Sequence, residues 1–144
     1  MKPDKLFYIG QKALIRKNNE ILILHDPVIN KIDLPGGKIQ IGEYDFNSAL
    51  KREVYEETCL KIKINRPIDI GYFFFSRGTN HRNAGKEIFI VFYDCQYISG
   101  KIKISKEHDS YQWINKANYK KYFKDKNNIY EVISKYFNNK YSCI

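Results

Sequence analysis

The spacing of apolar residues changes along this chain, and the two spacings predict strands in some segments and helices in others. Short apolar runs, and runs that alternate apolar with polar residues, predict strands. Strands are expected at residues 7–16 with a break at Gly10, and at 21–24, 61–65, 68–76, 87–98 and 101–104. The first two flank the turn residues Asn18 and Asn19 and predict a hairpin, and 87–98 is the expected central strand.

Two segments show the spacing of amphipathic helices. Residues 46–58 place Leu50 and Val54 one turn apart, and residues 128–137 form a C-terminal helix. The apolar side of this second helix consists of Ile129, Val132, Ile133 and Phe137. Strands and helices in this order predict an α/β (α+β) protein, in which a mixed β-sheet carries helices on its faces.

The segments between these elements are expected to be irregular. Residues 25–31 and 77–86 are predicted loops, and the tail at 138–144 is expected to fray. Residues 110–114 contain Tyr111 and Trp113, which are expected to pack against the body of the protein. The aromatic run 72–75 fits a core strand with one exposed face, and it also fits a wall on which a base stacks.

The first predicted helix carries a cluster of carboxylates. Glu53, Glu56 and Glu57 are related by i, i+3 and i+4, so they fall within an arc of about 100°. Like charges at these spacings cost about 0.2–0.5 kcal/mol per pair on an isolated helix. A divalent cation reverses the sign of that cost, and Mg²⁺ prefers such oxygen ligands. The neighbouring Arg52 can hold a carboxylate in two hydrogen bonds and fix its orientation.

A glycine-rich turn precedes this helix. Residues 33–39 read Asp-Leu-Pro-Gly-Gly-Lys-Ile, in which the proline restricts one φ angle and the glycines permit a tight turn. The turn can therefore bring a bare carbonyl, that of Gly37, close to a ligand. Glu43 follows near the start of the helix, where the helix dipole favours a negative charge.

The acidic run has a simpler interpretation when it is considered alone. An R-E-x-x-E-E segment is most often a solvated helix face, and a Gly-Gly pair is usually only a turn. All of these features in order between Leu34 and Leu60 favour a metal site that acts on a phosphate chain.

This stretch resembles the Nudix box, the motif of the Nudix hydrolase family, written G-x5-E-x7-R-E-U-x-E-E-x-G-U with U a bulky aliphatic residue. The residues that match its defined positions in order are Gly37, Glu43, Arg52, Glu53, Val54, Glu56, Glu57 and Leu60. Two departures stand out. The segment between Glu43 and Arg52 is one residue longer than the pattern, and Cys59 replaces the late glycine near the helix C-terminus, where a left-handed cap favours glycine.

The resemblance implies an α/β/α sandwich that hydrolyses a nucleoside diphosphate linked to another group, with Mg²⁺ or Mn²⁺. It implies that Glu53, Glu56 and Glu57 bind the metal with the Gly37 carbonyl. Glu53 would be the base or would position the water, Arg52 would orient the glutamates, and Glu43 would support them from outside the metal's coordination sphere. Nucleoside triphosphates or their oxidised forms, ADP-ribose and dinucleoside polyphosphates all remain possible substrates.

Residues outside the box are less certain to take part. A further carboxylate often contributes in this family, and Glu87 and Glu107 are the candidates, although each fits a surface position. His81 and His108 likewise fit loop or surface positions. The loop at 77–86 and the strand around Tyr72 are the candidates for reading the base or sugar.

Length and charge set the remaining expectations. The 144 residues fit one domain, 1–144, and the net charge of +9 comes from 25 Lys and Arg against 16 Asp and Glu. This excess fits attraction of an anionic substrate or RNA, and it also fits a lysine-rich surface from biased composition. A non-catalytic nucleotide- or RNA-binding Nudix module is therefore the alternative function, and a homodimer is possible because dimers are common in the family.

The cysteines and the lengths of the apolar segments indicate where in the cell the protein is expected. Cys59, Cys95 and Cys143 are far apart and odd in number, and the histidines do not stand at zinc-ligand spacing, so reduced thiols are expected. Neither a transmembrane run nor a signal-peptide core is present in the sequence, which predicts a cytoplasmic protein without membrane partners.

Overall fold

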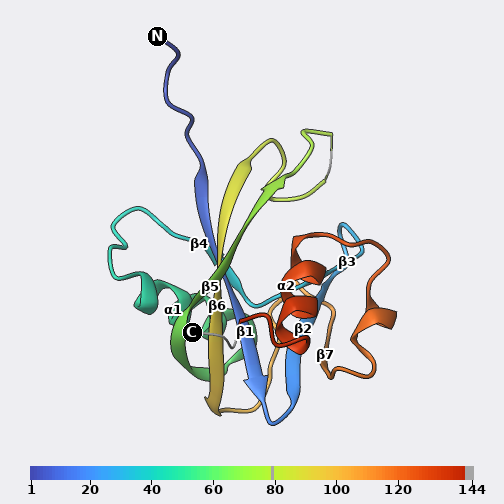
Figure 1. Ribbon diagram of the computed structural model, residues 1–144. Coiled ribbons are helices and arrows are strands. Elements are labelled where there is room, and N and C mark those ends of the chain that lie inside the picture. Colours follow the sequence, from blue (N-terminus) through green and yellow to red (C-terminus); the bar gives the residue numbers. More distant parts are fainter. Residues whose placement is uncertain (79, 142–144) are drawn as a thin grey trace.

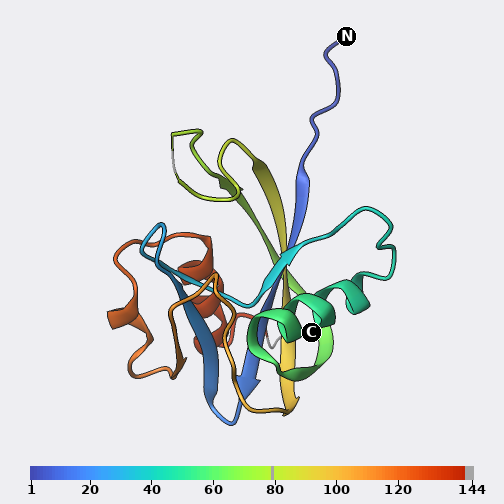
Figure 2. The ribbon, with the colours of Figure 1, turned by 180° about the vertical axis from the view of Figure 1, so that it is seen from behind.

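The computed structural model describes residues 1–78 and 80–141, and these form a mixed sheet with one α-helix on each face (Figures 1 and 2). The strands of the described part are β1 (Tyr8–Lys17), β2 (Glu20–Asp26), β3 (Lys31–Asp33), β4 (Gly36–Lys38), β5 (Lys61–Phe74), β6 (Glu87–Ser99) and β7 (Ser110–Ile114). The helices are α1 (Phe46–Thr58), α2 (Asn128–Phe137) and a short 3₁₀ helix, η1 (Tyr119–Tyr122).

The sheet is mixed because its two central strands run parallel while their other neighbours are antiparallel. The strand order is β3-β2-β1-β6-β5, with β4 paired to β1 and β7 paired to β2. β1 and β6 form the parallel pair, and β5 and β2 lie antiparallel on either side of them. The hairpin of β1 and β2 and the central position of β6 confirm two of the predictions from sequence.

Two cores fill the spaces between the sheet and the helices, because residues along a strand alternate between its faces. In β1, Ala13 and Ile15 pack with Leu50 and Val54 of α1, whereas Leu14 packs on the other face. The α2 residues Ile129, Val132, Ile133 and Phe137 belong to that second core, as their spacing predicted. This alternation positions α1 rigidly on one face of the sheet.

Both ends of α1 follow from local sequence. Asp45 is the N-cap, and its carboxylate accepts a 3.1 Å hydrogen bond from the Ser48 N–H. Cys59 is the C-cap with φ 61° and ψ 15°, and its N–H donates to the Tyr55 carbonyl at 2.8 Å. Cys59 therefore keeps the left-handed cap conformation that favours glycine, so the replacement does not alter the cap geometry. Both predicted helices begin and end at the residues where the structure has them.

Three of the predictions about strands need correction. Gly10 does not break β1, and the two strands predicted at 61–65 and 68–76 form one strand, β5, with register irregularities beside Pro67. Residues 101–104 are not a strand. They run beside the end of α1, where the N–H groups of Lys103 and Ser105 donate to the otherwise unpaired carbonyls of Thr58 and Glu57.

The aromatic predictions hold in part. In the run 72–75, Phe73 and Phe75 pack on the core, whereas Tyr72 and Phe74 are exposed. Trp113 packs on the α1 core as predicted, but Tyr111 points out of the same strand and is 46% exposed. The prediction for the tail falls partly outside the described residues, as does Cys143, while Cys59 and Cys95 are free thiols.

Candidate active site

A cleft of about 660 Å³ opens where β1, β4 and α1 meet the loops that follow β5 and β6. Its lining has two different ends. One end carries Glu53, Glu56 and Glu107 with the backbone of Gly36 and Gly37. The remainder is mixed: its apolar, aromatic and basic residues include Tyr8, Lys12, Ile32, Lys38, Phe73, Phe75, Arg82, Ile88 and Ile129, and Asp26 and Asp33 also line it. The cleft therefore combines a carboxylate cluster with side chains suited to an anionic, aromatic ligand.

Arg52 organises the carboxylates at the start of this site. Its Nε and one terminal nitrogen donate to the two oxygens of Glu43, both at 2.9 Å. Its terminal nitrogens also donate to Glu53 at 2.9 Å and to Glu56 at 3.0 Å. The hydrogen bonds with Glu43 are the main reason that the pKa of Arg52 is raised. One guanidinium thus fixes three carboxylates that would otherwise repel each other.

Glu53 lies directly against the glycine turn. A Cβ atom added at Gly37 would lie 2.5 Å from the Glu53 carboxylate, so only a glycine leaves room for it. The Glu53 side chain is 15% exposed, and burial raises its pKa although the charge of Arg52 opposes the shift. The turn and the helix therefore place a partly buried carboxylate beside a bare stretch of backbone.

Glu57 is more deeply buried than the other glutamates of the box. One of its oxygens accepts a 3.0 Å hydrogen bond from the Gly36 N–H. Its second oxygen, Oε2, is buried and has no hydrogen-bond partner among the described residues. Burial raises the pKa of Glu57 to about 7, even though the charge of Lys12 opposes the shift. The proton is therefore held more tightly here than on an ordinary glutamate.

A buried line of charged and polar groups leads away from Glu57. His108 has a fully buried side chain, with Nδ1 3.4 Å from the Glu57 Oε2 and Nε2 3.3 Å from the Asp33 Oδ2. Asp33 is also 3.0 Å from the Nζ of Lys12. Burial opposes ionisation of Asp33, but the charge of Lys12 and the contact with His108 hold its pKa well below the usual range.

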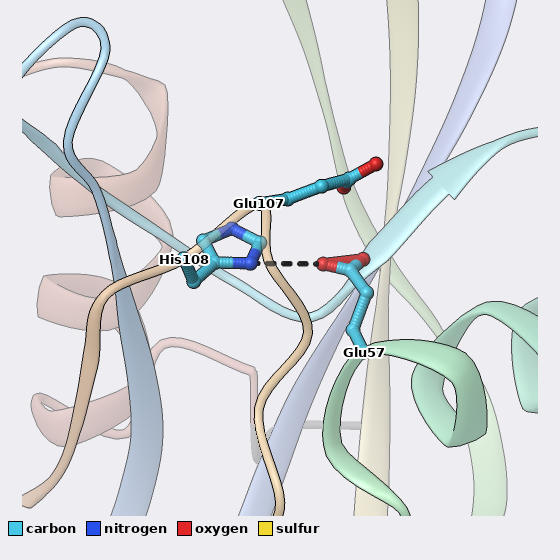
Figure 3. Close-up of side chains that lie close together, drawn as sticks. All are labelled: Glu57, Glu107 and His108. Carbon is cyan, nitrogen blue, oxygen red and sulfur yellow. Dashed lines mark ion pairs between the residues drawn. The ribbon is translucent and has the colours of Figure 1, made fainter.

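Glu107 completes this group. Figure 3 shows Glu57, Glu107 and His108 together, and one ligand atom from each lies within 4.8 Å of those of the other two. Glu107 and His108 lie in the loop before β7, about fifty residues after α1 in sequence, so only the fold brings them to Glu57. Glu107 is also held by an ion pair with Arg82 at 3.2 Å.

His81 and His108 lie in loops as predicted, but neither lies at the surface. His108 is 4% exposed, and His81 is 7% exposed with its Nε2 2.9 Å from Asp26. His81 also stacks on Phe75, with ring centroids 4.4 Å apart. Glu87, in contrast, pairs with Lys5 and Tyr72 at the start of β6. A Lys-Glu-His triplet in a loop gave no periodic signal from which burial could be inferred.

The donor set suits a hard or borderline divalent cation. The buried Glu57 Oε2 and His108 Nδ1 both lack hydrogen-bond partners in the described part of the chain, and they face each other beside a third ligand, Glu107. Buried polar atoms are normally paired, so an unpaired pair marks a place for a further partner. Carboxylate oxygens are the ligands that Mg²⁺ and Mn²⁺ accept.

The sequence and the fold were compared with those of known proteins. The family model of the NUDIX domain matches residues 11–136. A search of curated proteins found no significant match.

Similar solved structures include a MutT protein from Methanosarcina mazei Go1, with TM-score 0.72, 24% identity, and coverage of 96% of this chain and 98% of that one. A NUDIX-family hydrolase from Clostridium perfringens has TM-score 0.72 and 16% identity. The match covers 94% of this chain and 99% of that one. An ADP-ribose pyrophosphatase from Streptococcus suis has TM-score 0.57 and 20% identity, with 75% and 73% covered.

The family model covers most of the chain. The mixed sheet with a helix on each face matches the fold of these neighbours. The chain therefore belongs to the Nudix hydrolase family, and its class of activity is pyrophosphate hydrolysis. None of the helices in the described ranges is long and apolar enough to cross a membrane.

Proposed function

We propose that this chain is a single Nudix domain, residues 1–144, that hydrolyses the pyrophosphate bond of a nucleoside diphosphate linked to another group. The observation that carries this proposal is the cleft in which box carboxylates meet an aromatic and basic wall. An acidic end would hold a divalent ion, and the basic residues would meet the phosphates. Apolar and aromatic side chains would then contact the nucleoside.

The metal would be held by the carboxylates that the box and the loop before β7 supply. Glu53, Glu56 and Glu57 are the proposed ligands from the helix, with the Gly37 carbonyl, and Glu107 joins them from the loop. When bound, Mg²⁺ or Mn²⁺ supplies neutralisation of the phosphate charge and activation of water. Arg52 holds Glu53 and Glu56 in place, and Glu43 in turn holds Arg52.

Glu53 is the proposed base. Its carboxylate lies beside the Gly37 backbone and lines the cleft, so it can orient a water molecule against a bound phosphate. Burial raises its pKa, which strengthens it as a proton acceptor relative to an exposed glutamate. Arg52, at 2.9 Å, keeps that carboxylate in one orientation.

The basic side chains of the cleft are the proposed phosphate contacts. Lys12, Lys38 and Arg82 all line it, and Arg82 already binds a carboxylate of the acidic end. Phe73 and Phe75 line the same cleft from the end of β5 and the loop after it. They provide flat apolar surfaces of the kind on which a base stacks, which makes this region the proposed nucleoside site.

The proposal is tested by measuring Mg²⁺-dependent hydrolysis of nucleoside triphosphates, ADP-ribose, dinucleoside polyphosphates and capped RNA. Glu57→Gln should lower turnover by orders of magnitude, because it removes a charged ligand while keeping the shape of the side chain. Glu131→Gln, an exposed glutamate on α2, is the matched control and should leave turnover unchanged.

Two results would contradict the proposal. Equal turnover in the wild-type and Glu57→Gln proteins would show that the box does not carry the activity. Tight nucleotide or RNA binding without cleavage of any compound would favour a non-catalytic binding module instead. A steep dependence of RNA affinity on salt would then identify the basic surface as the binding determinant.

A further inference from the structure

Two buried polar atoms face each other next to Glu107, which lines the acidic end of the cleft. The Glu57 Oε2 and the His108 Nδ1 are 3.4 Å apart, and their side chains are 5% and 0% exposed. Neither atom has a hydrogen-bond partner among residues 1–78 and 80–141. A buried polar atom without a partner costs about 1–3 kcal/mol, so this arrangement calls for something between the two side chains.

The second nitrogen of His108 also lies against a carboxylate. Nε2 lies 3.3 Å from the Asp33 carboxylate, which Lys12 also contacts. A carboxylate accepts hydrogen bonds only, so the tautomer with its hydrogen on Nε2 donates to Asp33 and leaves the Nδ1 lone pair facing Glu57. A carboxylate behind an imidazole is the arrangement that orients a metal-binding histidine in many metal sites.

The third ligand supports the same conclusion. One ligand atom each from Glu57, Glu107 and His108 lie within 4.8 Å of one another. Donors that share one ion with bonds of about 2.1 Å lie at most about 4.2 Å apart, so the three side chains would have to close by no more than about 0.6 Å around an ion. Figure 3 shows that Glu107 and His108 leave the same loop and that His108 is directed at Glu57, which comes from the end of α1.

We propose that the Nδ1 of His108 is a ligand of the divalent ion that Glu57 and Glu107 bind. This inference rests on the proposed function, because it adds a ligand to the metal of the same site. A nitrogen donor among carboxylates favours Mn²⁺ or Co²⁺ over Mg²⁺, which binds imidazole poorly. The site is therefore expected to prefer Mn²⁺ more strongly than a site with oxygen ligands alone.

The test is pulsed electron paramagnetic resonance of Mn²⁺ bound to the 144-residue protein. A directly bound imidazole gives a ¹⁴N hyperfine coupling, and selective ¹⁵N-histidine labelling should replace it with a ¹⁵N coupling. His108→Gln should abolish this signal. His25→Gln, which alters a partly exposed histidine paired with Asp109 and Asn30, should retain it.

Affinity provides a second measurement that does not depend on turnover. The ratio of the Mg²⁺ to the Mn²⁺ dissociation constant, measured by titration calorimetry, should fall about tenfold in His108→Gln. If wild-type protein binds Mn²⁺ but shows no ¹⁴N coupling from histidine, His108 is not a ligand. The proposed metal site of carboxylates would then still stand. Protein that binds neither Mn²⁺ nor Mg²⁺ would overturn the proposed function as well.

Discussion

The carboxylate of Glu43 binds the guanidinium of Arg52 through two hydrogen bonds of 2.9 Å, across nine residues of sequence. The segment between them is one residue longer than the Nudix pattern, yet the pair forms. The chain accommodates the extra residue before the helix. Glu43 accepts from the Gln40 N–H, and Asp45 caps α1, so the loop is anchored on both sides.

Replacing Arg52 tests this arrangement. Arg52→Lys keeps the charge but cannot bind Glu43 in two parallel hydrogen bonds while also reaching Glu53 and Glu56. We expect kcat to fall about 10- to 100-fold, with little change in the far-UV circular dichroism spectrum. Lys51→Gln, the exposed neighbour on the helix, should leave kcat unchanged. Full activity of Arg52→Lys would mean that charge alone is sufficient.

The close approach of Gly37 to Glu53 gives a second prediction. A methyl group at position 37 would lie 2.5 Å from the Glu53 carboxylate, so Gly37→Ala must displace that side chain or the turn. We expect hydrolysis to fall at least tenfold. Lys51→Ala, at an exposed position on the helix that carries Glu53, is the control and should leave hydrolysis unchanged. Steady-state kinetics of both variants would show whether the distance to Glu53 matters.

The raised pKa of Glu57 gives a prediction for stability against pH. The pKa is about 7 in the folded protein and about 4.3 in an unfolded chain. The folded state therefore binds the proton more tightly, and the free energy of unfolding falls as pH rises from about 4.3 to 7. Each pH unit in this range lowers the free energy of unfolding by up to about 1.4 kcal/mol. The total decrease is therefore on the order of 3 kcal/mol.

Glu57→Gln should remove that loss, because glutamine does not ionise. Urea unfolding in the presence of a chelator should show the variant gaining stability relative to wild type as pH rises from 5 to 8. Added Mg²⁺ or Mn²⁺ should reduce the difference in stability between wild type and variant at high pH, because a cation favours the ionised carboxylate of the wild type. A pH-independent difference between the two proteins would show that the Glu57 proton is not linked to folding.

The C-cap of α1 gives a prediction that is independent of catalysis. Cys59 has a φ of 61°, a conformation that favours glycine. Cys59→Gly should raise the free energy of unfolding by about 1 kcal/mol. Cys59→Ala retains a Cβ atom in the same conformation and should give no such gain. Chemical denaturation of the three proteins, with unchanged hydrolysis, would confirm that the departure from the family pattern affects stability only.

Local sequence was sufficient to predict the helices, because their signals are spacings between residues one or two turns apart. Both helices were predicted with the ends that the structure shows. Their apolar residues are spaced as on one face of a helix, as Leu50 and Val54 are in α1. The left-handed conformation of Cys59 was seen only in the structure, because the motif favours glycine at this position. Strand boundaries were less predictable, because Gly10 and Pro67 interrupt the pattern of strands that the sheet keeps continuous.

The sequence by itself determined the family, the acidic helix, the glycine turn and the position of the box carboxylates, because all of these depend on spacings within about twenty residues. Only the tertiary structure decided that Glu107 and His108 lie beside Glu57 and that Asp33 and Lys12 stand behind them. These groups come from separate segments, and the packing of α1 and the loop before β7 brings them together. Burial by that packing, which no local pattern encodes, also raises the pKa of Glu57.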